Sequence, residues 1–276
     1  MAKKIFGAFI ILTVLIGAFF DFPLPANFKF QNYEKVNAQT VEEVAAGAKV
    51  LVLNYHQVAN TFNALAIPVN DFDAQMRFLS ENGYVTITPD ELAGGFSGEV
   101  NLPEKPVLIT FDDGYTDNYT NAFPILKKYG MRATIFVIAG FVGQPRYMTW
   151  DQLREMEQNG ISIESHTMNH IALEELPDDE IRNELLNSKN TIEQNLNNKV
   201  EFLAYPTGTY NLHIASIARE VGYKGAYTVK YGVDDLGSNM YALERVPIFQ
   251  TENTMKSFYE RTEYRQNFEE FGWIKK

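Results

Sequence analysis

The sequence contains no cysteine, only four histidines and no dense cluster of lysine and arginine. The absence of cysteine excludes disulfides, iron–sulfur clusters and a cysteine nucleophile, so any metal must be held by His, Asp or Glu. Acidic residues number 35 against 24 basic ones, which gives a formal charge of -11. Because a nucleic-acid backbone needs a basic face, we expect no nucleic-acid partner. An acidic exterior suits a neutral or cationic ligand, or serves only solubility.

The first 20 residues resemble a targeting segment more than part of a fold. Lys3 and Lys4 precede an uncharged apolar run, Ile5–Phe20, which is the pattern of an export signal. The run is slightly short of the roughly 20 residues that span a bilayer comfortably, although about 17 suffice. A cleaved signal sequence and a retained membrane anchor are therefore both open, and either predicts an extracellular or cell-surface protein. This segment is the one membrane contact we expect.

The rest of the 276 residues divides into a linker and one large domain. Residues 21–48 contain prolines, asparagines and glutamines without a sustained period, which predicts a linker. From residue 49 to residue 276, hydrophobic runs alternate with helical patterns, and we assign this range to one domain. The predicted strands are Val50–Tyr55, Tyr84–Ile87, Val107–Phe111, Ala133–Ile138, Ile161–Ser165, Phe202–Tyr205, Ala226–Val229 and Arg245–Phe249. The predicted helices are Asp71–Asn82, one beginning at Pro89, Asn118–Tyr129, Thr149–Asn159, Asp178–Leu196 and Leu212–Val221.

This alternation of strands and helices predicts an α/β fold. Successive strands separated by helices pair in parallel through right-handed crossovers, and seven or eight such units in one domain favour a barrel over an open sheet. In a barrel of this kind the chemistry lies on loops that follow the carboxyl ends of the strands. Candidate functional residues are therefore sought immediately after predicted strands.

Two adjacent carboxylates, Asp112 and Asp113, end the predicted strand Val107–Phe111 and precede Gly114. Because adjacent residues at a strand end point in different directions, one acid can bind a cation while the other accepts a proton. An isolated Asp-Asp-Gly would more simply form an Asx turn that caps a loop. The pair is not isolated here, because two histidines, His166 and His170, follow another predicted strand.

Two histidines, His166 and His170, follow the predicted strand Ile161–Ser165. At this i, i+4 spacing they lie on one face if the turn is helical. Two neutral imidazoles and one carboxylate make a three-ligand metal site with an open coordination position, as in catalytic zinc centres. A purely structural metal site is disfavoured because three ligands leave that position open.

Two further post-strand segments supply candidates for proton transfer and oxyanion binding. His56 ends the first predicted strand, and histidine is the side chain that most readily exchanges a proton near neutral pH, so it is a candidate general acid. A buried structural histidine is the alternative. Thr207 lies between Pro206 and Gly208, a turn in which a backbone N–H can be fixed toward a developing oxyanion. Alone, that segment would be an ordinary turn.

Together these segments resemble the polysaccharide deacetylases of carbohydrate esterase family 4, the NodB-type homology domain. Thr110–Gly114 (TFDDG) is similar to the first motif of that family, and His166–His170 (HTMNH) to the second. Tyr205–Gly208 (YPTG) resembles the third, with Thr207 where tyrosine is usual. The resemblance implies a distorted (β/α)7–8 barrel of the polysaccharide deacetylase type.

The resemblance also implies a role for each residue. Asp112 is implied as the catalytic base, and Asp113, His166 and His170 as ligands of a divalent metal, zinc with cobalt or nickel as alternatives. The implied reaction is hydrolysis of an N-acetyl group, with Thr207 N–H on the oxyanion and acetate as a product.

Two departures from the family pattern affect the expected site. The arginine that usually opens the third motif and braces the catalytic base is missing before Tyr205. The late Leu-x-His motif that supplies the general acid is also absent, because Leu243-Glu244-Arg245 contains no histidine. His56 lies instead in an early Leu-Asn-Tyr-His segment, which resembles the circularly shifted motif order of extracellular poly-β-1,6-N-acetyl-D-glucosamine N-deacetylases of biofilms.

We therefore expect a secreted or surface-held monomer that deacetylates a β-linked N-acetylglucosamine polysaccharide. Poly-β-1,6-N-acetylglucosamine is the favoured substrate. Peptidoglycan, chitin oligomers or an O-acetylated glycan are the alternatives for the same chemistry. A catalytically silent glycan-binding module on the same scaffold is the alternative from another functional class, and the missing arginine is the feature that keeps it open.

Overall fold

The computed structural model describes residues 49–264, and the predicted export segment (1–20) and linker (21–48) lie outside the described residues. Eight strands form one all-parallel sheet in the order β1-β10-β9-β8-β7-β6-β5-β4. They are β1 (Leu51–Tyr55), β4 (Val85–Thr86), β5 (Pro106–Asp113), β6 (Thr134–Val137), β7 (Ser162–Ser165), β8 (Phe202–Ala204), β9 (Gly225–Tyr231) and β10 (Leu243–Pro247). An additional pairing of β1 with β5 closes seven of them into a barrel, to which β4 is appended. The predicted barrel is confirmed.

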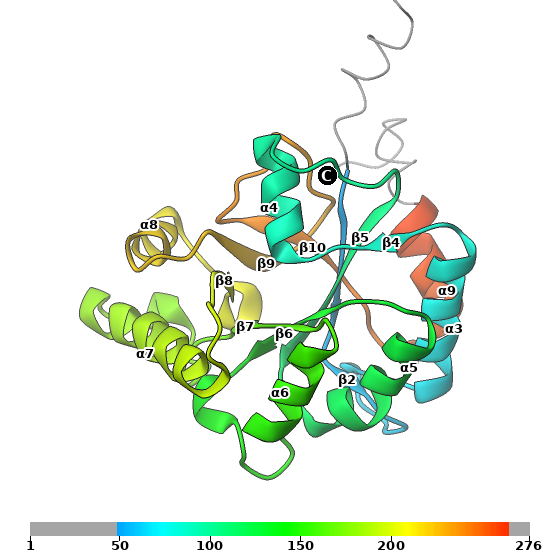
Figure 1. The fold of residues 1–276 in the computed structure, drawn as a ribbon, viewed down its shortest axis with the longest axis horizontal. Coiled ribbons are helices and arrows are strands. Elements are labelled where there is room, and N and C mark those ends of the chain that lie inside the picture. Colours follow the sequence, from blue (N-terminus) through cyan, green and yellow to red (C-terminus); the bar gives the residue numbers. More distant parts are fainter. Residues whose placement is uncertain (1–48, 265–276) are drawn as a thin grey trace, which may run out of the picture. The chain divides into compact units, whose positions relative to one another are not determined.

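Helices surround this ring (Figure 1), as right-handed crossovers between parallel strands require. They are α3 (Val69–Glu81), α4 (Pro89–Ser97), α5 (Phe123–Lys128), α6 (Trp150–Gln158), α7 (Asp178–Leu196), α8 (Leu212–Glu220) and α9 (Thr254–Tyr259). Thr88 caps α4 and Thr149 caps α6, each through a reciprocal capping box with the residue three positions later. No helix among residues 49–264 is long and apolar enough to cross a membrane.

Most predicted elements form with small shifts at their ends, and a few differ. The predicted helix Asn118–Tyr129 begins with a π-helical turn, η1 (Asn118–Ala122), and only then continues as α5. The two-residue strands β2 (Gln57–Val58) and β3 (Ala66–Ile67) were not predicted, because so few residues show no periodicity. For the same reason the six-residue helix α9 was not predicted.

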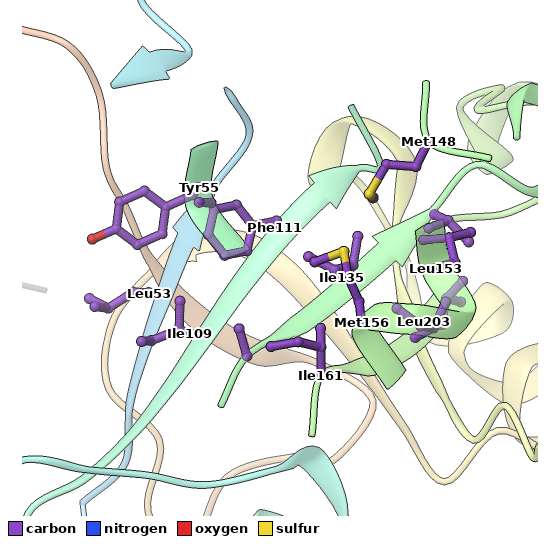
Figure 2. Close-up of a cluster of buried hydrophobic side chains, with 14 of the residues drawn as sticks. Leu53, Tyr55, Ile109, Phe111, Ile135, Met148, Leu153, Met156, Ile161 and Leu203 are labelled. Carbon is purple, nitrogen blue, oxygen red and sulfur yellow. The ribbon is translucent and has the colours of Figure 1, made fainter. Parts of the chain in front are cut away.

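Alternation of side chains along the strands separates two hydrophobic clusters. Val52 of β1 and Leu108 of β5 point into the barrel, where Leu92 of α4 packs against the same cluster. Their neighbours point outward against the helices, and Figure 2 shows Leu53 and Ile109 in that outer layer. Further along both strands the inward-facing residues are polar, namely Asn54 on β1 and Thr110 and Asp112 on β5. The interior of the barrel is thus apolar at one end and polar at the other.

Candidate active site

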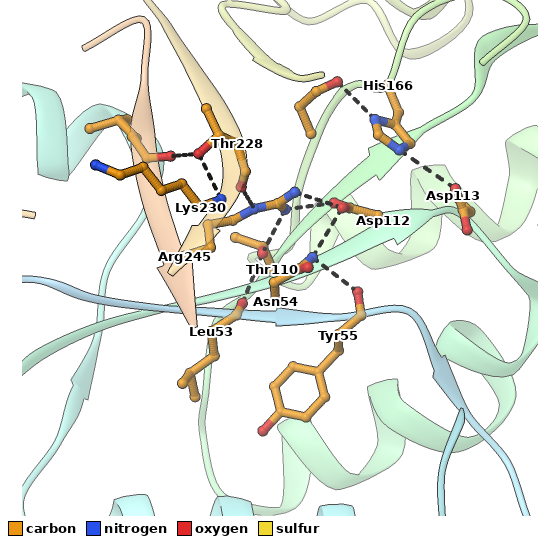
Figure 3. Close-up of polar contacts among 12 residues, drawn as sticks. Leu53, Asn54, Tyr55, Thr110, Asp112, Asp113, His166, Thr228, Lys230 and Arg245 are labelled. Atoms are coloured by element: carbon orange, nitrogen blue, oxygen red, sulfur yellow. Dashed lines mark hydrogen bonds and ion pairs between the residues drawn. The ribbon is translucent and has the colours of Figure 1, made fainter. Parts of the chain in front are cut away.

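The catalytic-base candidate, Asp112, is the last inward-facing residue of β5 and is held by three hydrogen bonds (Figure 3). Arg245 of β10 donates from Nη1 to Oδ1 and from Nη2 to Oδ2, each at 2.7 Å, and Asn54 Nδ2 donates to Oδ2 at 3.0 Å. Arg245 is itself fixed by Thr228 O, which accepts from Nε at 2.7 Å. The exposed fractions of Asp112 and Arg245 are 2% and 0%. The orientation of the Asp112 carboxylate is therefore set before any substrate arrives.

Burial alone would raise the pKa of Asp112, but the guanidinium of Arg245 outweighs it and holds that pKa well below its ordinary value. His166 and His56 act in the same direction. The carboxylate is therefore ionised at neutral pH and can accept a proton. Arg245 belongs to Leu243-Glu244-Arg245, the segment that sequence reasoning noted only for its lack of histidine. The arginine missing before Tyr205 is thus replaced by Arg245, which a different strand, β10, supplies to Asp112.

Asp113, His166 and His170 converge into one cluster of candidate ligand atoms within 4.8 Å of one another. Asp113 Oδ1 lies 3.5 Å from His166 Nε2 and 3.6 Å from His170 Nε2. Two ligand atoms at about 2.1 Å from a tetrahedral zinc would be about 3.4 Å apart, so the spacing fits one shared cation. Asp113 follows Asp112 on β5, where successive side chains point in different directions, and its backbone departs from the extended conformation with a φ of 73°.

Local backbone geometry, and not a helix, brings the two histidines together. Residues 166–170 form an irregular loop in which Thr167 and His170 have positive φ angles of 65° and 57°. The turn is therefore not helical, yet the two side chains still meet, with ring centroids 4.7 Å apart. Glu184 of α7 stabilises the loop, because its carboxylate accepts from the backbone N–H groups of Met168 (3.1 Å) and Asn169 (2.8 Å).

The hydrogen bonding of His166 leaves one ring nitrogen free for a ligand role. Its Nδ1 lies 2.8 Å from Ala204 O, which can only accept, so Nδ1 carries the proton and Nε2 presents a lone pair toward Asp113. Burial lowers the pKa of His166, which favours the neutral imidazole that binds metals. The donor set of two imidazoles and one carboxylate suits zinc and similar divalent ions. The residues therefore fit a divalent metal site.

His56 lies in the same cavity, held through its backbone by η1. Asn118 Nδ2 donates to His56 O at 2.7 Å, and Asn121 Nδ2 donates to Val58 O at 2.7 Å. Asp117 Oδ1 also accepts from Val58 N at 2.8 Å. Asp117, which precedes η1, and two asparagines within η1 thus fix the segment that carries His56.

Thr207 follows β8 in a strained turn beside the same cavity. Its φ of 58° is in the left-handed region, which costs a β-branched residue about 1–2 kcal/mol or more. Gly208 follows with a φ of 75°, and a Cβ there would lie 2.2 Å from the Val229 side chain. Among the hydrogen bonds of residues 49–264, none uses the Thr207 N–H, so this donor is available to a ligand. Strain of this kind is typical of functional sites.

One cavity of about 470 Å³ at the carboxyl end of the barrel connects the candidate base, the candidate metal ligands, His56 and Thr207. Its walls also include apolar side chains, among them Leu65, Val229 and Phe249. The structure brings together every site residue predicted from the sequence, namely His56, Asp112, Asp113, His166, His170 and Thr207. It adds Asn54 and Arg245, which sequence reasoning missed.

Comparison with known proteins agrees with this geometry. The family model described as polysaccharide deacetylase matches residues 99–226. YxkH of Bacillus subtilis (strain 168), a protein assigned to the polysaccharide deacetylases, is 41% identical over 201 residues, which cover 73% of this chain and 72% of that protein. The chain belongs to the polysaccharide deacetylase family. As a polysaccharide deacetylase it is a hydrolase of carbohydrate esterase family 4.

Two further polysaccharide deacetylase comparisons bear on fold and substrate. Deacetylase PplD of Streptococcus pyogenes, solved in complex with acetate, superposes with a TM-score of 0.73 at 30% identity, covering 78% of this chain and 99% of that one. Poly-β-1,6-N-acetyl-D-glucosamine N-deacetylase of Staphylococcus aureus (strain MSSA476) is 27% identical over 227 residues, 72% of this chain and 78% of that protein. This chain thus shares its fold with the solved deacetylase PplD, and its sequence similarity extends to the Staphylococcus aureus enzyme.

Proposed function

We propose that this polysaccharide deacetylase removes N-acetyl groups from a β-linked N-acetylglucosamine polysaccharide, with poly-β-1,6-N-acetylglucosamine as the favoured substrate. The observation that carries the proposal is the single cavity in which Asp112, paired with Arg245, lies beside the Asp113–His166–His170 cluster and His56. The similarity to the poly-β-1,6-N-acetyl-D-glucosamine N-deacetylase of Staphylococcus aureus supports this substrate. The early position of His56 in the chain supports the same subgroup.

Asp113, His166 and His170 would hold the metal, which we propose to be zinc. When bound there, a divalent cation supplies Lewis-acid polarisation of the acetyl carbonyl oxygen. One carboxylate and two neutral imidazoles leave room for further ligands, as catalytic zinc sites require.

The other residues perform the proton transfers and bind the developing charge. Asp112 Oδ accepts a proton from the attacking water, and its ion pair with Arg245 keeps it ionised and oriented before the reaction. The Thr207 N–H donates to the oxyanion that forms on the acetyl carbonyl. His56 donates a proton to the departing nitrogen. Water and the N-acetyl sugar are thereby converted into acetate and a free amino sugar.

We also propose that the protein acts outside the cytoplasm as a monomer with one catalytic domain at residues 49–276. The proposal of export rests on Lys3 and Lys4 before the apolar run Ile5–Phe20. Residues 21–48 would be the linker between that segment and the domain. All of the proposed catalytic and metal-binding residues come from one chain, so the site needs no second copy.

Acetate release by the purified full-length protein tests the proposed substrate. The panel contains poly-β-1,6-N-acetylglucosamine, chitin oligomers, peptidoglycan and an O-acetylated glycan, each with added zinc. We expect release from poly-β-1,6-N-acetylglucosamine at the highest kcat/KM. A higher kcat/KM on another member of the panel would contradict the substrate while retaining the deacetylase chemistry.

A further inference from the structure

A second cavity adjoins the catalytic one and is not used by the proposed reaction. It has a volume of about 290 Å³, near the lower end of the roughly 300–1,000 Å³ typical of small-ligand pockets. We call it the Phe62 pocket, and its lining residues are Phe62, Asn63, Ala64, Gln250, Thr251 and Glu252.

The boundary between the two cavities lies at two bonded chain segments. In the first segment, Ala64 lines the Phe62 pocket and Leu65 lines the catalytic cavity. In the second, Gln250 lines the Phe62 pocket and Phe249 lines the catalytic cavity. Gln250 N donates to Ala64 O at 2.9 Å, which joins the two segments at this boundary. A polysaccharide chain with one sugar in the catalytic cavity must continue past its rim, and the Phe62 pocket lies at that rim.

The loop that carries Phe62 is ordered by hydrogen bonds although its tip is exposed. The Gln250 side-chain amide faces the carbonyl oxygens of Thr61, Asn63 and Ala66 at 3.0, 2.9 and 3.1 Å. Asn63 Nδ2 donates to Gln57 Oε1 at 3.1 Å, and Leu65 N donates to Asn63 Oδ1 at 3.0 Å. These bonds fix the loop before binding, which lowers the entropic cost of ordering it around a ligand.

The chemistry of the pocket suits an amino sugar. Phe62 is fully exposed, at 106% of its reference surface, and its flat apolar ring can cover the C–H face of a pyranose. Glu252 is also exposed, and no ion pair among the described residues involves it. The nearest lysine along the chain, Lys256, pairs with Glu260 instead at 3.6 Å. A sugar whose N-acetyl group has been removed carries an ammonium, which would complement this carboxylate.

We propose that the Phe62 pocket is a subsite for the sugar next to the one being deacetylated, and that Glu252 selects a glucosamine there. The inference rests on the proposed function. In this arrangement Phe62 covers the ring and Glu252 accepts from its ammonium, so each completed deacetylation creates a preferred neighbour for the next. The enzyme would then produce runs of free glucosamine and not a random distribution.

Three trimers of N-acetylglucosamine, in the linkage that the parent enzyme prefers, test the inference. One is fully acetylated, and the other two carry a glucosamine at the reducing or the non-reducing end. Loss of the central acetyl group is followed by mass spectrometry. We expect the parent to deacetylate one glucosamine trimer about ten-fold faster in kcat/KM than the fully acetylated trimer, as one charge-assisted hydrogen bond would provide.

Variants of the pocket separate its two roles. Glu252→Gln should reduce the ten-fold preference to about one. Phe62→Ala should lower the ratio of kcat/KM on trimers to kcat/KM on a single N-acetyl sugar about ten-fold, while Phe62→Tyr should retain it. Glu99→Gln and Leu236→Ala, two exposed residues that line neither cavity, are the matched controls and should keep the parent's ratios.

The outcomes distinguish this inference from the proposed function. A parent enzyme that releases acetate but prefers neither glucosamine trimer would overturn the subsite alone. A preference that survives Glu252→Gln would also overturn it. A parent that releases no acetate from any trimer or polysaccharide would overturn the proposed function together with the subsite.

Discussion

The ion pair between Asp112 and Arg245 is the residue-scale feature on which the site depends. Both side chains are almost completely buried, so each charge has lost its hydration and relies on the other. Removing one partner of such a pair typically costs about 3–5 kcal/mol, because the remaining charge is buried without compensation. The pair therefore couples the stability of the barrel interior to the ionisation of Asp112, the proposed catalytic base.

Replacement of the arginine should move the pH profile of the reaction. Without the guanidinium, burial dominates and the pKa of Asp112 rises, so the base becomes protonated at a higher pH. We therefore expect Arg245→Met to shift the acidic limb of kcat/KM to higher pH and to lower the free energy of unfolding by about 3–5 kcal/mol. Arg132→Met, which breaks the less buried pair with Glu91, is the matched control. An acidic limb at the parent's position would disprove the role of Arg245.

At the scale of residues, the sequence predicted the chemistry of single side chains better than it predicted which side chains they contact. The Asp-Asp-Gly and His-x-x-x-His segments contain every candidate metal ligand, because carboxylates and imidazoles can be recognised as metal-binding groups from residue type alone. Arg245 carries no such signal, since it is 133 positions from Asp112 and meets it only when β10 and β5 both pair with β1. The sequence does not reveal how the strands are aligned with one another, and it is this alignment that brings the two side chains together.

At the scale of elements, helices outside the barrel hold the loops that carry the site. Glu184 of α7 binds the backbone of Met168 and Asn169, and η1 binds the segment that carries His56. These contacts, and not a helical turn, hold the loop that carries the two histidines. The spacing of His166 and His170 was informative, but it does not encode the positive φ angles of this loop or its contacts with Glu184, 15 and 16 residues further along the chain.

Loss of the Glu184 carboxylate should therefore weaken metal binding without removing a ligand. We expect Glu184→Ala to lower the affinity for zinc about 10–100-fold, the usual effect of removing a group that orients metal ligands. Titration of the purified variants with zinc and a competing chelator measures this change. Glu180→Ala, an exposed acid one turn earlier on α7, should bind zinc as the parent does. Equal affinities in the two variants would contradict the bracing role.

At the scale of the whole molecule, the structure buries two acids that are not part of the site, Glu164 on β7 and Asp234 between β9 and β10. Burial raises the pKa of Glu164 to about 8 although the N–H groups of Phe202 and Glu201 donate to it, and burial raises the pKa of Asp234 to about 7. The alternation of strands and helices was enough to predict the barrel. Its polar interior was harder to predict, because inward-facing positions become evident only once the ring has closed.

Because the pKa values of these two acids are raised in the folded protein, we predict that its free energy of unfolding falls as the pH rises. Between about pH 5 and pH 8 Glu164 is protonated in the folded protein and ionised in the unfolded chain, so the folded state binds more protons. The free energy of unfolding should then decrease by up to roughly 1.4 kcal/mol per pH unit for this carboxyl. Glu164→Gln keeps an acceptor oxygen for both N–H groups and should flatten the slope in urea titrations. A slope equal to the parent's would contradict this account.

The most direct test of the central claim is metal-dependent acetate release by the full-length protein and its Asp112→Asn variant. After chelation and dialysis we expect no release from either, and about one zinc bound per chain to each on titration. Added zinc should restore release by the parent, while Asp112→Asn should remain at least about 10²-fold slower, as expected for loss of a general base. Undiminished release after complete removal of metal, or by Asp112→Asn, would contradict the assignment of this site.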